Sequence, residues 1–176
     1  EVADIAGLHG ADLAVVVNPN NPDGRTHTPA DLLALSGQVG RLVIDESFAD
    51  PCPGLSLASR AGHNGLFVLR SFGKFYGLAG LRLGFVLGGA GDIATLSAQS
   101  GPWPISGAAI EIGRKALSDG VWAATTIARL QTEAAQVDDL ARQAGWQLVG
   151  GGALFRLYDT PDAGAAQAQL ARHRIW

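Results

Sequence analysis

Short apolar runs that end abruptly in polar residues recur along the first half of the chain, and such runs are typical of buried strands. We predict strands at residues 13–17, 41–45, 66–70 and 83–87. The connections between them favour a mostly parallel sheet with right-handed crossovers. In an open α/β sheet, ligands bind at the carboxyl edge of the strands, so the polar residues that follow the first two runs are expected at such an edge.

Helical signals alternate with these runs. Thr28, Pro29 and Asp31 combine a capping side chain, a proline at the first helical position and an acid in the first turn, which predicts a helix start. Further helices are predicted at about residues 92–98, 107–117 and 121–143, the last of them long and amphipathic. A strand at 154–158 and a helix at about 161–173 complete an α/β fold.

The composition shifts at Gly145, where helical periodicity gives way to the segment 146–149 and then to a glycine run. We therefore predict two parts. Residues 1–144 form a large domain that ends in the long helix, and residues 145–176 begin a smaller C-terminal α/β subdomain.

Composition and charge limit the function. With 47% hydrophobic residues, the 176-residue chain has enough apolar side chains for a core. A net charge of −3 with scattered arginines disfavours nucleic acid as a partner, and no apolar stretch is long enough to span a membrane. The single cysteine, Cys52, cannot form an internal disulfide, which predicts a reducing, cytoplasmic location.

One of only two lysines, Lys74, lies among glycines and aromatic residues in the segment 71–84. An amine held among apolar side chains pays desolvation in its charged form, which favours the nucleophilic neutral form and Schiff-base chemistry. The ordinary alternative is a lysine that extends its amine to water from a glycine-rich turn.

Three other positions have similar alternatives. Asn21, in Asn-Pro-Asp-Gly, can be a turn former, Asp45 a helix cap, and Arg82 a charge at a strand edge.

Taken together and in this order, the three segments 15–24, 42–48 and 71–84 resemble the pyridoxal-phosphate (PLP) enzymes of the aspartate aminotransferase fold, class I and II. The resemblance implies a fold type I large-domain sheet with part of the small subdomain. It implies that Asn21 binds the phenolic oxygen of PLP, that Asp45 pairs with the ring nitrogen and that Lys74 forms the Schiff base. Ser71 and Arg82 correspond to the phosphate ligands, and a hydroxyl and a guanidinium suit that group.

Phe48 stands where many relatives carry a tyrosine, so the hydroxyl contact with the phenolic oxygen is absent. This residue, with segments 101–107 and 150–158, resembles the L-threonine O-3-phosphate decarboxylases of cobalamin synthesis, which are kin of histidinol-phosphate aminotransferases. The resemblance implies a phosphorylated amino acid as substrate and loss of its carboxylate as CO2. An aminotransferase of histidinol-phosphate type and a non-catalytic PLP-binding regulatory module remain alternatives.

The resemblance also implies a larger, homodimeric protein. The chain has no methionine, and members of the family run to roughly twice its length. We therefore expect a fragment that lacks part of the cofactor cage and is inactive alone, with most ligands for the substrate outside it.

Other sites are disfavoured. His9, His27, His63 and His173 lack the spacing of a helical metal site, so no metal is predicted. The glycine-rich segment also breaks the P-loop and dinucleotide-binding patterns, and no nucleophile elbow is present.

Overall fold

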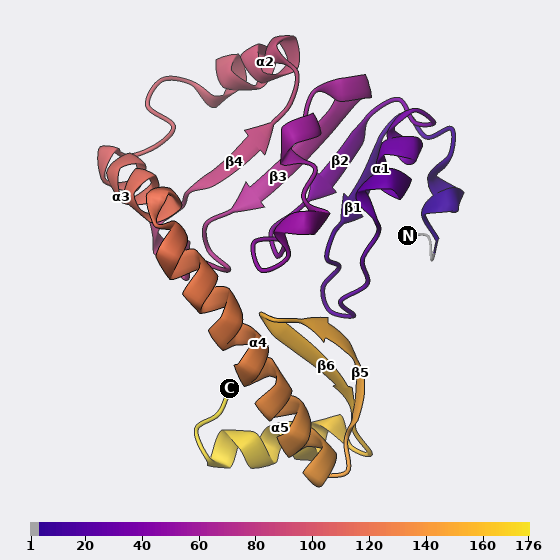
Figure 1. Cartoon of the computed structure of the whole chain (residues 1–176), viewed down its shortest axis with the longest axis vertical. Coiled ribbons are helices and arrows are strands. Elements are labelled where there is room, and N and C mark those ends of the chain that lie inside the picture. Colours follow the sequence, from indigo (N-terminus) through magenta and orange to yellow (C-terminus); the bar gives the residue numbers. More distant parts are fainter. Residues whose placement is uncertain (1–3) are drawn as a thin grey trace.

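The computed structural model describes residues 4–176, and its largest sheet has four strands in sequential order. They are β1 (Ala14–Val17), β2 (Leu42–Asp45), β3 (Leu66–Ser71) and β4 (Gly84–Leu87). β1, β2 and β3 run parallel, whereas β4 is antiparallel to β3 (Figure 1). The carboxyl ends of the three parallel strands therefore lie at one edge, toward the lower half of the molecule.

Helix α1 (Pro29–Ser36) connects the first two strands and begins at the expected residue. Thr28 and Asp31 form a reciprocal capping box, which satisfies backbone N–H groups that the first turn leaves free. Leu32 and Leu35 turn inward and join the apolar side chains of β1, β2 and β3 in the main core. This burial holds the three parallel strands together and so fixes the edge where they end.

Short 3-10 helices connect many of these elements. They are η1 (Ile5–Leu8), η2 (Pro53–Leu55), η3 (Ala58–Arg60), η4 (His63–Gly65) and η5 (Ala79–Leu81). The last of them lies in the turn between β3 and β4, inside the segment that carries Lys74.

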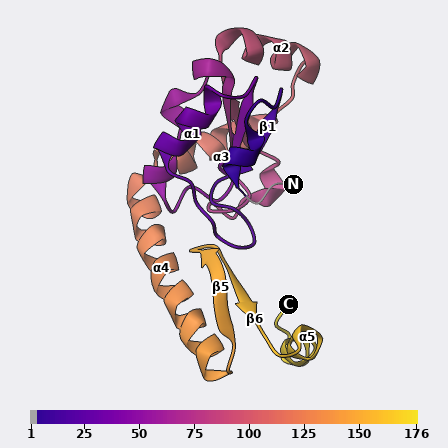
Figure 2. The ribbon, with the colours of Figure 1, turned by 90° about the vertical axis from the view of Figure 1, so that its right-hand side faces the viewer.

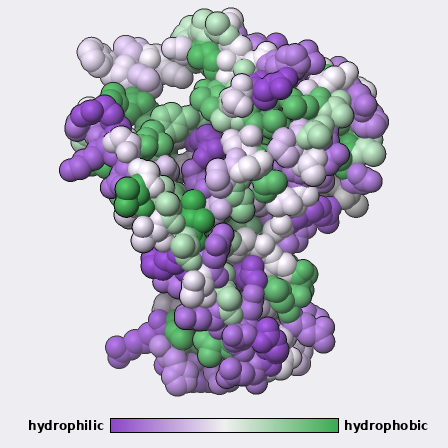
Figure 3. All heavy atoms as spheres, viewed as in Figure 1, coloured by the Kyte–Doolittle hydropathy of each residue, from purple (hydrophilic) through white to green (hydrophobic). Residues whose placement is uncertain are grey.

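The second half of the chain leaves the sheet through helices and ends in a small hairpin. Its elements are α2 (Ala90–Ser100), α3 (Gly107–Ser118), α4 (Gly120–Gln143), β5 (Gln147–Gly152), β6 (Phe155–Asp159) and α5 (Ala163–Arg172). Figure 2 shows α4 running away from the sheet, with the antiparallel β5–β6 hairpin between α4 and α5. In Figure 3 the surface around α5 is mainly hydrophilic, while larger hydrophobic patches lie over the sheet half.

A cluster of polar side chains joins the hairpin to α4. Arg156 donates from Nε to Asp138 Oδ1 at 2.9 Å and from Nη2 to Asp138 Oδ2. The Tyr158 hydroxyl also donates to Asp138 Oδ1, at 2.6 Å. The hydrogen bonds from Arg156 hold the pKa of the Asp138 carboxyl below its usual value. Arg156 and Asp138 side chains are 22% and 14% exposed, so this pair is shielded from water more than the other pairs on α4.

The predicted α/β class is confirmed, and the predicted strands and helices occur with ends shifted by one to two residues. One element was missed: β5 continues through the glycine run to Gly152, with an irregular register between Leu148 and Gly150. The division at residues 144 and 145 stays a prediction. Among the described residues, no helix is both long and apolar enough to cross a membrane.

Candidate functional site

Three of the predicted site residues line one cavity of about 300 Å³ in the turn between β3 and β4. They are Ser71, Lys74 and Arg82, and the remaining wall is formed by Gly73, Ala79, Leu83 and Gly84. A hydroxyl, an amine and a guanidinium thus converge on one space, a donor set that suits an anionic oxygen-rich group such as phosphate. The chemistry of the cavity fits the ligand that the sequence predicts there.

Local hydrogen bonds shape this turn. The Gly73 N–H donates to Ser71 Oγ at 3.2 Å, and the Gly77 N–H donates to the Lys74 carbonyl at 3.1 Å. Arg82 follows η5 with a φ of 52°, the left-handed region, which ends the 3-10 turn and directs the chain into β4. Its Nη1 lies 3.4 Å from the Ala79 carbonyl, so the guanidinium stays at the cavity wall.

Aromatic side chains anchor the turn on either side of Lys74. Phe72 and Phe75 are buried, and Tyr76 stacks on Phe72 with ring centroids 4.3 Å apart and on Trp122 of α4 at 5.7 Å. Phe72 and Phe75 therefore pack into the interior, whereas the Lys74 side chain is exposed.

Of the two interpretations of Lys74, the structure agrees with the one in which the amine extends to water, because its side chain is exposed within residues 4–176. Its neighbours in sequence are apolar, but they pack away from it. The aromatic contact that Lys74 does make comes from another strand end: Nζ lies 5.2 Å from the centroid of the Phe48 ring. Phe48 thus defines one side of the space that the amine can reach.

Asp45 is the last residue of β2 and is partly buried. Its Oδ1 accepts hydrogen bonds from the Ser47 N–H at 2.9 Å and from Ser47 Oγ at 2.5 Å. Its Oδ2 has no hydrogen-bond partner among residues 4–176. The carboxylate is therefore oriented by Ser47, a contact that the sequence reading missed, and its second oxygen remains available to a ligand.

Asn21 lies in the loop after β1, at the same sheet edge as Asp45. Its side chain is exposed and makes no hydrogen bond to another described residue. The loop is instead fixed by buried Asn18, which accepts from the His27 N–H at 2.9 Å and donates to the His27 carbonyl at 3.1 Å. Neither Asn21 nor Asp45 lines the cavity around Lys74, so the five predicted residues share an edge but not one enclosed pocket.

The hairpin contacts this loop through glycines. A Cβ built on Gly150 would lie 2.0 Å from the Asp23 carbonyl oxygen, and one on Gly24 would lie 2.2 Å from the Gly151 carbonyl oxygen. Only residues without a side chain permit this backbone approach. The loop that carries Asn21 therefore rests directly on β5, the strand that the sequence analysis missed.

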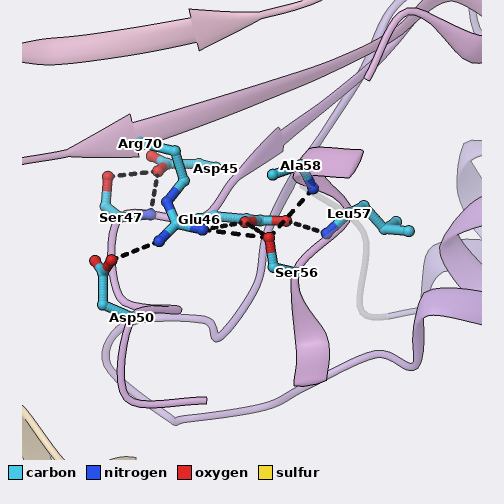
Figure 4. A network of polar contacts seen from close by, with 8 residues as sticks. All are labelled: Asp45, Glu46, Ser47, Asp50, Ser56, Leu57, Ala58 and Arg70. Carbon is cyan, nitrogen blue, oxygen red and sulfur yellow. Dashed lines mark hydrogen bonds and ion pairs between the residues drawn. The ribbon is translucent and has the colours of Figure 1, made fainter. Parts of the chain in front are cut away.

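A second unpredicted feature is a buried network of charges next to Asp45 (Figure 4). Arg70 bridges Glu46 and Asp50, and Glu46 is fully buried. Burial raises the pKa of Asp50 despite the nearby Arg70, and burial likewise raises the pKa of Tyr76. The available signal in the sequence was a charge of each sign directly beside a candidate ligand: Glu46 beside Asp45 and Arg70 beside Ser71.

Comparison with known proteins finds a matching family, aminotransferase class I and II, over residues 4–175. Threonine-phosphate decarboxylase of Pseudomonas aeruginosa is 42% identical over 172 residues, which cover 96% of the chain and 52% of that protein. The enzyme of the same name from a Sinorhizobium species is 43% identical, covering 99% of the chain and 54% of the relative. A histidinol-phosphate aminotransferase of Mycobacterium tuberculosis is 36% identical, with 87% and 43% covered. The chain spans about half the length of these curated relatives.

Solved structures share the arrangement of elements. L-threonine-O-3-phosphate decarboxylase from Porphyromonas gingivalis superposes with a TM-score of 0.79 at 25% identity, over 93% of this chain and 53% of that one. Histidinol-phosphate aminotransferase from Sinorhizobium meliloti, solved with pyridoxal-5'-phosphate, superposes with a TM-score of 0.84 at 20% identity. That match covers 94% of this chain and 48% of the other, and it supports the fold alone.

Proposed function

The chain belongs to the class I and II aminotransferase family, and from this premise we propose that it forms the cofactor-binding part of a PLP-dependent L-threonine O-3-phosphate decarboxylase. The observation that carries the proposal is the identity of 42% and 43% to two threonine-phosphate decarboxylases over nearly the whole chain.

The donor chemistry of the site supports PLP as the cofactor. Ser71, Lys74 and Arg82 line one cavity, and their hydroxyl, amine and guanidinium suit a phosphate and an aldehyde. Asp45 offers an oxygen with no partner among residues 4–176, which suits a protonated ring nitrogen. We propose that Asn21 binds the phenolic oxygen, for which its exposed side chain at the same edge is free.

Each residue then has a defined task. Arg82 and Ser71 hold the phosphate group, and Asp45 retains the proton on the ring nitrogen. Bound PLP supplies an aldehyde for amines and a cationic ring that accepts the electron pair of a breaking bond. Lys74, which lines the same cavity, would hold the cofactor through its aldehyde, and its Nζ would be placed to carry a proton to or from the substrate.

The overall change that we propose is loss of the substrate carboxylate as CO2. A proton takes its place on the same carbon, which yields 1-amino-2-propanol O-phosphate. Phe48 adds no hydroxyl near the proposed cofactor site. Its ring lies 5.2 Å from Lys74 Nζ, so the lysine amine has an apolar neighbour on that side.

An aminotransferase of histidinol-phosphate type is the second candidate, supported by 36% identity to the mycobacterial enzyme. Both activities use the same proposed cofactor ligands. The choice between them depends on which bond of the substrate is presented to the ring, and residues that bind the substrate decide this.

The proposal extends to the setting of the whole protein. We propose a homodimer in cobalamin biosynthesis, located in the cytoplasm, that acts on a small phosphorylated amino acid without nucleic acid or membrane partners. Because the relatives are about twice as long, we also propose that the 176-residue chain alone is inactive. Turnover of any amino acid by the isolated chain would contradict that last point.

A product analysis tests the function. The whole protein that carries this chain is incubated with PLP and L-threonine O-phosphate, without a keto acid, and products are identified by mass spectrometry. We expect 1-amino-2-propanol O-phosphate and CO2. A parallel reaction with histidinol phosphate and a keto acid tests the second candidate. Cofactor binding without either product would favour the non-catalytic regulatory module. A protein that binds no PLP would overturn the decarboxylase, the aminotransferase and the regulatory module alike.

A further inference from the structure

Two charged residues lie directly beside two of the proposed cofactor ligands. Glu46 follows Asp45 at the end of β2, and Arg70 precedes Ser71 at the end of β3. Successive side chains of a strand point to opposite faces. Glu46 and Arg70 therefore share the face opposite the one that carries Asp45 and Ser71, and Figure 4 shows them turned toward each other.

Their contacts link the two strands at the point where the ladder ends. The register pairs Asp45 with Leu69, and the Glu46 N–H donates to the Leu69 carbonyl at 3.0 Å. One residue further, Arg70 Nη1 lies 2.9 Å from Glu46 Oε2, and Arg70 Nη2 lies 2.5 Å from Asp50 Oδ1. The guanidinium thus ties the end of β3 to both the end of β2 and the loop after it.

The buried carboxylate of Glu46 has further partners. Ser56 Oγ donates to Oε2 and the Leu57 N–H donates to Oε1, each at 2.6 Å. Glu46 is 0% exposed, and the Arg70 side chain is 23% exposed. A buried ion pair adds little net stability but holds a defined geometry when its hydrogen-bonding groups are satisfied, so this pair is better suited to fixing positions than to adding stability.

We propose that the Glu46–Arg70 pair is a clamp that fixes the distance between Asp45 and Ser71, and hence between the ligands for the two ends of the cofactor. The inference rests on the proposed function, in which Asp45 binds the ring nitrogen and Ser71 the phosphate. Glu46 and Arg70 are positioning residues, because they act through their neighbours in the chain and do not touch the cofactor.

A ligand held at two ends gains affinity when both contacts form at once, and that gain depends on their spacing. Loosening the clamp should therefore weaken the binding of a ligand that contacts both Asp45 and Ser71 more than the binding of a ligand that contacts only one of them. PLP spans both ends, pyridoxal lacks the phosphate, and inorganic phosphate lacks the ring. A merely structural role would weaken all three in parallel.

The test measures dissociation constants of PLP, pyridoxal and inorganic phosphate for the whole protein and its variants. Glu46→Gln removes the charge with little change of shape. Arg70→Lys keeps the charge but loses the fork that reaches two carboxylates. Arg129→Gln is the matched control, because it removes an exposed ion pair with Glu133 on α4.

In Glu46→Gln we expect PLP affinity to fall about tenfold or more, with losses below about threefold for pyridoxal and phosphate. Arg70→Lys should show the same selectivity with a smaller loss, and it keeps the test decisive if Glu46→Gln does not fold. Parallel losses for all three ligands, or unchanged PLP affinity in a folded variant, would overturn the clamp. An unmodified protein that binds no PLP would instead overturn the proposed function.

Discussion

The rings of Phe48 and Phe155 meet edge to face, with their centroids 4.9 Å apart and their planes at 73°. Phe48 follows β2 and lies beside Lys74, whereas Phe155 begins β6 in the C-terminal hairpin. The hairpin therefore contacts the candidate site through Phe155, which packs on Phe48, and the Phe48 ring in turn lies 5.2 Å from Lys74 Nζ.

This contact predicts a measurable coupling between the two parts of the chain. Edge-to-face pairs contribute about 1 kcal/mol beyond burial of their area. We expect a double-mutant cycle with Phe48→Leu and Phe155→Leu to give a coupling of that size in the free energy of unfolding, measured by urea denaturation. Val149→Ala, an exposed position of the same hairpin, should be additive with Phe48→Leu. Additivity of the two phenylalanine substitutions would contradict the contact.

Gly150→Ala tests the backbone contact between β5 and the loop of Asn21. The added Cβ would lie 2.0 Å from the Asp23 carbonyl oxygen, so the loop or the strand must move. We expect a loss of about 1–3 kcal/mol in unfolding free energy, together with weaker PLP binding in a titration. Gly107→Ala at the start of α3 is the control, since its Cβ meets open space and alanine favours a helix. Equal behaviour of the two variants would show that the loop tolerates the displacement.

The elements that the sequence could predict are those formed by interactions between residues close together in the sequence. The capping box of Thr28 and Asp31, and the apolar run of β1, are signals within a few residues, and both elements appear where expected. β5 was missed because its glycines carry no strand propensity and are needed for contact with Asp23 and Gly24, which are distant in sequence.

In the candidate site, too, the features within one turn could be predicted and those that depend on distant residues could not. The clustering of Ser71, Lys74 and Arg82 around one cavity follows from a single turn. The surroundings of Lys74 do not follow from that turn, because the flanking aromatic residues pack against α4 and the contact with Phe48 comes from the loop after β2. The pairing of Glu46 with Arg70 likewise depends on the register of β2 and β3, which no local pattern gives.

Lys74→Ala tests the proposed covalent role. In the whole protein we expect loss of the borohydride-reducible adduct with PLP, detected by mass spectrometry, with some cofactor still bound through Ser71 and Arg82. Lys115→Ala removes the other lysine, on α3, and should leave the adduct intact. An adduct that persists in Lys74→Ala would assign the Schiff base to another amine.

Asp45→Asn tests the proposed electrostatic role of Asp45 at the ring nitrogen of the cofactor. The amide keeps the shape and an acceptor for Ser47, but it no longer holds a proton on the ring. We expect the coloured cofactor complex to form while turnover falls about 100-fold or more. Asp92→Asn removes an exposed carboxylate that pairs with Arg41, so its turnover should match that of the unmodified protein. Full activity of Asp45→Asn would contradict the assignment.

The contact of the hairpin with α4 should depend on pH through Asp138. Hydrogen bonds from Arg156 lower the pKa of this carboxyl in the folded protein. Its stabilising contribution is therefore present above the unfolded pKa of about 3.9 and is lost as pH falls through the lower folded pKa. We expect Asp138→Asn to cost about 2 kcal/mol of unfolding free energy at neutral pH and the difference to shrink below about pH 4. Asp139→Asn, beside it in an exposed pair with Arg142, should show little of either effect, and a pH-independent difference for Asp138→Asn would contradict the ion pair.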